Sequence, residues 1–143
     1  MTSTWRFALL SVLLTLAPQT VHARTDFLPA GTKLNVRTTQ PIAASSARRG
    51  MRVDGYFYRP VFGPNARIVV PRGSPVTLEV EKVHRSLGRD VVTLSVRWVH
   101  VGRRRFRVFS NEIEVTAPKA TQLQFRLELD ARIPVVRHRI VGG

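Results

Sequence analysis

The chain has 143 residues and a strong excess of positive charge, with 23 Lys and Arg against 9 Asp and Glu and a formal net charge of +14. This length suits a single domain that can bury an adequate core without cross-links. The absence of cysteine excludes disulfides and thiolate metal sites.

The first 23 residues are predicted to be a secretory signal peptide that is cut after Ala23. Arg6 is their only charge, and Phe7 to Leu16 is an apolar run of ten residues. The run is too short to cross a bilayer comfortably, although an uncleaved anchor is the alternative interpretation. We therefore expect a mature chain that starts near Arg24, has no transmembrane span and is secreted or periplasmic.

Alternation of apolar and polar residues predicts β-strands through most of the remaining chain. In chain order the expected strands cover residues 33–38, 51–58, 68–70, 76–81, 92–98, 106–108, 111–115 and 123–129. Turns are expected at Ser86 to Arg89 and at Val101 to Arg103, where glycine can take a positive φ. Gly55, inside a strand, indicates a bulge or a close approach of another backbone.

Apolar residues at alternate positions of a strand, all odd-numbered or all even-numbered (one parity), are expected to share its buried face. In one strand these are Val92, Leu94, Val96 and Trp98, and in the last strand they are Leu123, Phe125, Leu127 and Leu129. The parity changes between Val108 and Ile113, which indicates a bulge or a corner. The pattern predicts an all-β fold, a small antiparallel β-barrel or β-sandwich of about seven to eight strands. Residues 24–131 would form the single domain, and residues 132–143 a C-terminal tail or an edge strand.

Several turn-and-strand motifs carry a resemblance to known proteins. They are Leu28–Arg37, Ser45-Ser46 with Gly50, and Val70–Ser74, followed by an arginine-containing strand that ends near Trp98. Together they resemble small secreted bacterial β-proteins of unknown function, and they are distantly similar to the β-barrel domain of TrbI-like type IV secretion channel proteins. The resemblance covers roughly residues 28–110 and implies a β-barrel fold and a location in the cell envelope. The sequence shows no cytoplasmic tail, membrane helix or proline-rich linker like those of a full channel component, so we do not expect a complete secretion-channel role.

No residue pattern predicts catalysis or a cofactor. His84, Ser86 and Asp90 are close in sequence, but they flank the expected hairpin turn, and no nucleophile elbow surrounds the serine. The histidines are scattered without metal-site spacing. Glu79 and Glu81 lie on one face of a strand, where we expect them to face arginines across the sheet. We therefore expect a non-enzymatic protein.

Arginines are the best functional lead, since a planar guanidinium suits phosphate and carboxylate groups. The primary cluster comprises Arg97, Arg103, Arg104, Arg105 and Arg107, around one expected hairpin. The secondary cluster comprises Arg48, Arg49, Arg52 and Arg59, beside Tyr56 and Tyr58. The alternatives are a solvated face that discourages aggregation and a genome that simply favours arginine.

The expected function is that of an envelope-associated module that binds polyanionic material, such as lipopolysaccharide or an acidic glycan, through the arginine-rich hairpin. An envelope protein or a membrane surface is a further candidate partner. The signal peptide argues against nucleic acid as the native partner. The alternative function is a structural subunit that pairs with a partner protein by β-strand addition, through the strand from Leu123 to Leu129.

Overall fold

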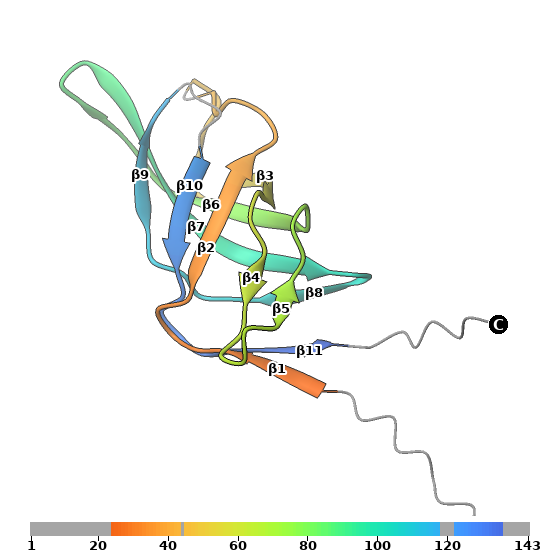
Figure 1. Cartoon of the computed structure of the whole chain (residues 1–143). Helices are drawn as coiled ribbons and strands as arrows, with labels where there is room; N and C mark the ends of the chain where they lie inside the picture. Colours follow the sequence, from red (N-terminus) through yellow and green to blue (C-terminus); the bar gives the residue numbers. More distant parts are fainter. Residues whose placement is uncertain (1–23, 44, 118–121, 136–143) are drawn as a thin grey trace, which may run out of the picture.

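The computed structural model describes residues 24–43, 45–117 and 122–135. The expected signal peptide and residues 136–143 of the expected tail lie outside these described residues. The described chain folds into antiparallel β-sheets (Figure 1), which confirms the predicted all-β class. No helix in these ranges has the length and apolar character needed to cross a membrane.

The described ranges contain more strands than the alternation predicts. In chain order they are β1 (Arg24–Leu28), β2 (Lys33–Thr38), β3 (Arg52–Phe57), β4 (Val61–Phe62), β5 (Ile68–Val70), β6 (Pro75–Ser86), β7 (Arg89–Val101), β8 (Arg104–Arg107), β9 (Ile113–Thr116), β10 (Gln122–Arg126) and β11 (Ala131–Val135). The short strand β4 is not among the strands that the alternation predicts. It is a strand because it pairs with β5, and a two-residue segment carries no alternation of its own.

The main sheet has the order β10-β2-β3-β6-β7-β8, and β9 also pairs with β7. The sheet curls into a half-barrel (Figure 1). Its two ends meet after β8 and β10, where Ser110 and Leu127 form an isolated bridge. There the Asn111 amide donates to the Arg126 carbonyl at 2.9 Å, and the Glu128 amide donates to the Phe109 carbonyl at 2.8 Å. The segment between β8 and β9 is therefore the corner that the parity change predicted.

One hydrophobic core fills the curl of the sheet. Its largest fully buried side chains include Phe57, Phe125, Leu34, Leu78 and Leu94. The β4–β5 hairpin and the β1–β11 pair add further side chains to the same core: Val61, Val69, Val70, Leu28, Ala131 and Ile133. β11 pairs with β1 along residues 131–135, and Ile133 of β11 is fully buried in this core.

The longest hairpin joins β6 and β7, which have 12 and 13 residues. Its two-residue loop is Leu87-Gly88, with φ of 51° and 74°. Positive φ at both positions is the mark of a type I′ turn, whose twist matches that of the flanking strands. The predicted turn is confirmed, and the hairpin projects well beyond the half-barrel (Figure 1).

Two β-bulges interrupt the pairing of β6 with β7. Leu78 faces Val96 while Thr77 faces Trp98, so Arg97 is an extra residue on β7. Val80 faces Leu94 while Lys82 faces Thr93, so Glu81 is an extra residue on β6. A bulge shifts the side-chain parity by one residue.

The bulge at Arg97 corrects one expectation. Val92, Leu94 and Val96 are buried as predicted, but beyond the bulge Val99 takes the core position. Trp98 is only half-buried and lies with the outward-facing side chains. The prediction that Trp98 shares the buried face was therefore wrong. The expectation for Leu129 was also wrong: Leu127 is buried, but Leu129 is 55% exposed because it lies in a bend beyond the end of β10.

Candidate functional site

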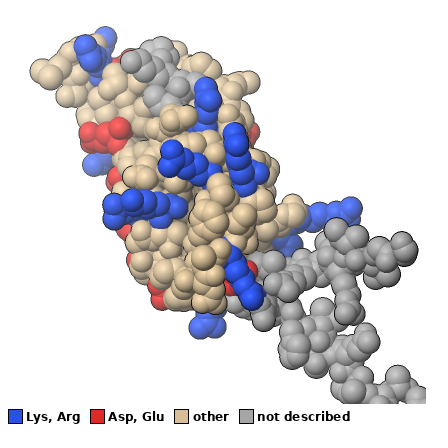
Figure 2. Space-filling model, viewed as in Figure 1, with Lys and Arg blue, Asp and Glu red and all other residues tan. Residues whose placement is uncertain are grey.

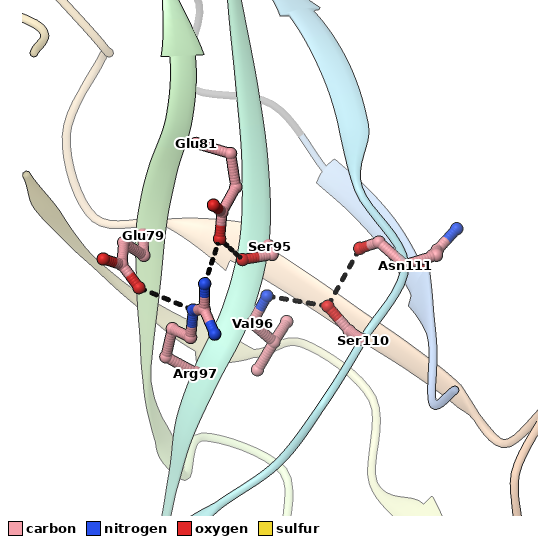
Figure 3. Close-up of polar contacts among 7 residues, drawn as sticks. All are labelled: Glu79, Glu81, Ser95, Val96, Arg97, Ser110 and Asn111. Carbon is pink, nitrogen blue, oxygen red and sulfur yellow. Dashed lines mark hydrogen bonds and ion pairs between the residues drawn. The ribbon is translucent and has the colours of Figure 1, made fainter. Parts of the chain in front are cut away.

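An ion-pair cluster lies on the outer face of β6 and β7, between the two bulges. Arg97 Nη2 and Glu81 Oε1 are 2.5 Å apart, and Arg97 Nε lies 2.5 Å from Glu79 Oε2 without the alignment of a hydrogen bond (Figure 3). Ser95 Oγ donates to Glu81 Oε1 at 2.6 Å. The expectation that Glu79 and Glu81 face an arginine across the sheet is confirmed.

The cluster shifts the pKa values of Glu81 and Arg97 in the directions that favour their charged forms. The hydrogen bond from Ser95 is the main cause of a lowered pKa at Glu81; partial burial opposes it, and Arg97 and Arg49 add to the lowering. Partial burial acts to lower the pKa of Arg97, but the hydrogen bond to Glu81 and the negative charges of Glu81 and Glu79 outweigh it and raise that pKa. Arg97 is thus a charge offset by two carboxylates, and it is poorly placed to recruit an external anion by itself.

We expect Glu81→Gln to lower the free energy of unfolding by about 1 kcal/mol at pH 7, discounted for partial exposure. The folded pKa of Glu81 lies below its unfolded value, so its contribution is complete above pH 4.5 and is lost as the pH falls through the folded pKa. Urea unfolding of both proteins at pH 7, 5 and 3 measures this. The difference should shrink only at the lowest pH, and a difference that is constant with pH would contradict the assignment. Glu114→Gln, at an exposed carboxylate on β9, is the matched control.

A second group of side chains forms a ladder of stacked cations and aromatic rings on β7, β8 and the segment that follows. The guanidinium carbon of Arg105 lies 4.7 Å from the ring centroid of Trp98. Arg107 lies 6.0 Å from the same ring and 5.3 Å from the ring of Phe109. We call these four residues, Arg105, Trp98, Arg107 and Phe109, the arginine–aromatic ladder. Cation–π contacts at such distances are attractive.

The pairing of β7 with β8 explains the ladder. Trp98 lies opposite Arg107, and His100 lies opposite Arg105, so these side chains share the outer face. Phe106 lies opposite Val99 and packs against the core. Without the bulge at Arg97, Trp98 would face the core, and its ring would not lie under the two arginines. His100 extends the same face, with Nε2 at 3.2 Å from Thr77 Oγ1.

Two hollows flank Arg97 and have opposite charge character. One, of about 310 Å³, is lined by Arg52, Arg97, Trp98, Arg107, Glu79, Thr77, Leu78 and Gly50. The other, of about 430 Å³, contains three carboxylates, those of Glu81, Glu112 and Glu128, beside Arg97 and Phe109. An anion is therefore favoured on the Trp98 side of Arg97 and disfavoured on the Glu112 side.

The predicted arginines do not form the two clusters that the sequence groups them into. Arg103, Arg104, Arg105 and Arg107 lie together on the β7–β8 hairpin, and all are exposed. Arg52, predicted in the secondary cluster, joins the hollow at Trp98.

The remaining secondary arginines are dispersed. Arg49 lines a hollow with Glu81 and Glu112, Arg48 is exposed in the same loop, and Arg59 lies beyond the far end of β3, 5.8 Å from the Tyr58 ring. Figure 2 accordingly shows Lys and Arg side chains in several separate places on the face in view.

The segment after β8 is held against β7 by residues that the sequence analysis did not identify. Ser110 Oγ accepts a hydrogen bond from the Val96 amide at 2.7 Å and donates to the Asn111 carbonyl at 2.9 Å (Figure 3). This holds the segment that carries Phe109 against β7. The sequence does contain a sign of the bulge at Arg97. Val96 lies at an even position and Val99 and Val101 lie at odd positions, so the apolar face changes sides between them.

The residues weighed for catalysis lie on the projecting hairpin. His84, Ser86 and Asp90 are all exposed there, and Asp90 faces Arg85 at 3.9 Å. Within the described residues, no group of three or more His, Cys, Asp or Glu side chains is placed to hold a metal ion. Comparisons with protein-family models, curated proteins and solved structures found no match to this chain.

Proposed function

We propose that this protein is a non-enzymatic module, exported to the cell envelope or beyond it, that binds polyanionic material through the arginine–aromatic ladder. The export rests on the pattern of residues 1–23, and the likeness to TrbI-like barrels stays a prediction from motifs. The observation that carries the binding proposal is the stacking of Arg105 and Arg107 on Trp98 and Phe109.

Stacking on the aromatic rings favours anion binding by Arg105 and Arg107. A guanidinium that lies over a ring keeps its N–H edge free for phosphate, sulfate or carboxylate oxygens. Because the ring already restricts the long side chain, less conformational entropy is lost when an anion binds. Arg52 borders the same hollow, and Arg103 and Arg104 extend the positive charge to the hairpin turn.

The test compares two double variants that remove the same charge. We expect Arg105→Gln/Arg107→Gln to weaken binding to heparin about tenfold or more, since each arginine would lose a charge-assisted hydrogen bond. Lys82→Gln/Arg89→Gln, on the projecting β6–β7 hairpin, should change binding by less than twofold. Isothermal titration in a salt series at about 50–200 mM, a range chosen because screening is strong there, measures both.

Trp98→Leu separates stacking from charge, because it keeps both arginines and removes the ring. It should weaken heparin binding by an intermediate amount. Equal losses in the two double variants, together with an unaffected Trp98→Leu, would mean that only net charge matters and would contradict the proposal. Immobilised lipopolysaccharide and peptidoglycan then identify which envelope material is retained at physiological salt.

Addition of a partner strand to β10 is the second candidate function. In its favour, β10 is the end strand of the sheet path and pairs with β2 on one side. Against it, the Arg126 end of the outer edge is already occupied, because the Arg126 amide donates to Asn111 Oδ1 at 2.8 Å. The predicted strand from Leu123 to Leu129 is also shorter than expected, since β10 ends at Arg126.

A further inference from the structure

The hairpin of residues 82–90, at the junction of β6 and β7, has properties that the folding of this chain does not require. Every residue from Lys82 to Asp90 is exposed, and the hairpin projects from the half-barrel (Figure 1). Leu87 at its tip is 100% exposed. A fully exposed leucine makes no contribution to the core.

A leucine is also unusual at this position because of the backbone conformation. Its φ is 51°, and the first central position of a type I′ turn favours Asn, Asp or Gly. Leucine is disfavoured in this left-handed region. Neither solubility nor turn geometry accounts for Leu87, so its role is expected to lie in a contact outside the monomer.

Basic side chains surround this apolar tip. Arg85 and Arg89 are each two residues from Leu87, and Lys82 lies farther along β6. Asp90, the acidic residue in this stretch, faces Arg85 at 3.9 Å. On the same strand parity as Leu87, Val83 adds a second partly exposed apolar side chain, 38% accessible.

We infer that this hairpin docks on an anionic lipid surface, with Leu87 entering the boundary between headgroups and acyl chains. At about 3.3 Å per residue, Arg85 would stand roughly 7 Å behind Leu87, and Arg89, which lies opposite Ser86, would stand roughly 3 Å behind it. The offset of Arg85 matches the depth of about 5–10 Å that apolar groups reach at a membrane interface. The long side chain of Arg89 can bend back toward the headgroups, so both guanidiniums reach the level of the lipid phosphates. A second copy of the chain is a poor occupant, because each copy carries a net charge of +14.

This site is separate from the arginine–aromatic ladder. The hairpin lies at the Arg89 end of β7, and the ladder lies at the Val101 end of the same 13-residue strand. The inference therefore holds or fails independently of heparin binding.

Sedimentation of the full chain with vesicles tests the docking. Vesicles of phosphatidylglycerol and phosphatidylcholine should retain the chain, and vesicles of phosphatidylcholine alone should not. Leu87→Asn keeps the charge and suits the turn better, yet it should lower partitioning about tenfold because the apolar contact is lost. Arg67→Gln/Arg72→Gln, at exposed arginines outside both the hairpin and the arginine–aromatic ladder, should leave partitioning within about twofold and serves as the control.

Leu87→Trp gives a direct measure of depth. Its fluorescence should be quenched by lipids brominated on the acyl chain, beyond any quenching of the parent chain. An effect of Leu87→Asn below twofold, or no added quenching of Leu87→Trp, would overturn the inference. Binding of the hairpin to an acidic protein with no retention by anionic vesicles would also overturn it, in favour of a protein partner.

Discussion

Phe125→Ala is expected to lower the free energy of unfolding by about 3–5 kcal/mol, the usual cost of removing a fully buried aromatic ring. Phe125 lies on β10 opposite Leu34 of β2, and both side chains are almost completely buried. The surrounding strands are tied by backbone hydrogen bonds, so they cannot collapse fully into the space that the ring leaves. Urea unfolding followed by far-ultraviolet circular dichroism measures the loss.

Leu129→Ala is the matched control for this prediction. Leu129 has the same parity as Phe125 in the sequence but is 55% exposed in the structure. Its replacement should change the free energy of unfolding by no more than about 0.5 kcal/mol. Similar losses for the two variants would show that β10 continues to Leu129 with one buried face, contrary to the structure.

Gly55→Ala is expected to destabilise the protein by about 1–3 kcal/mol, as other overpacked substitutions do. A Cβ at this position would lie 2.8 Å from the Arg37 carbonyl oxygen and 3.0 Å from Val36 Cγ1. The closest neighbour is backbone of β2, so the strand itself would have to shift. The prediction of a close backbone approach at Gly55 is confirmed by this geometry.

Gly88→Ala is the comparison for Gly55→Ala, because it adds backbone strain at a positive φ but no steric clash. Gly88 has φ of 74°, and a Cβ added there would meet no other atom within 4 Å, so its replacement strains the turn without a collision. A loss of about 1 kcal/mol is expected there. Chemical denaturation of both variants tests the contrast, and a Gly55→Ala protein as stable as the parent chain would refute the tight packing of β2 against β3.

Local alternation predicted the β-strands and most of their inner faces correctly. Val76, Leu78 and Val80 are buried and Glu79 and Glu81 lie outside, as a period of two requires. The prediction failed at Trp98, where pairing with β6 inserts a bulge and changes the parity, and at Leu129, which lies in a bend beyond the end of β10. It also missed β1 and β4, whose strand character comes from pairing with β11 and β5.

The candidate site was predicted in part. The arginines of residues 103–107 were identified from their density in the sequence. Their stacking on Trp98 and Phe109 was not, because Trp98 was placed on the buried face. Arg97 was grouped with them, but the structure holds it between Glu79 and Glu81. Arg52 joins Trp98 from β3 only because the sheet brings the two segments together across β6.

The sequence by itself determined the all-β class, the turns and the large positive charge, because periodicity, glycine placement and composition are local properties of the chain. Only the tertiary structure decided the curl of the sheet, the two bulges and the meeting of its ends at Ser110 and Leu127. Register is set by which strand lies alongside, and one extra residue in a pair turns every later side chain to the other face. That single-residue shift at Arg97 places Trp98 beneath the arginines.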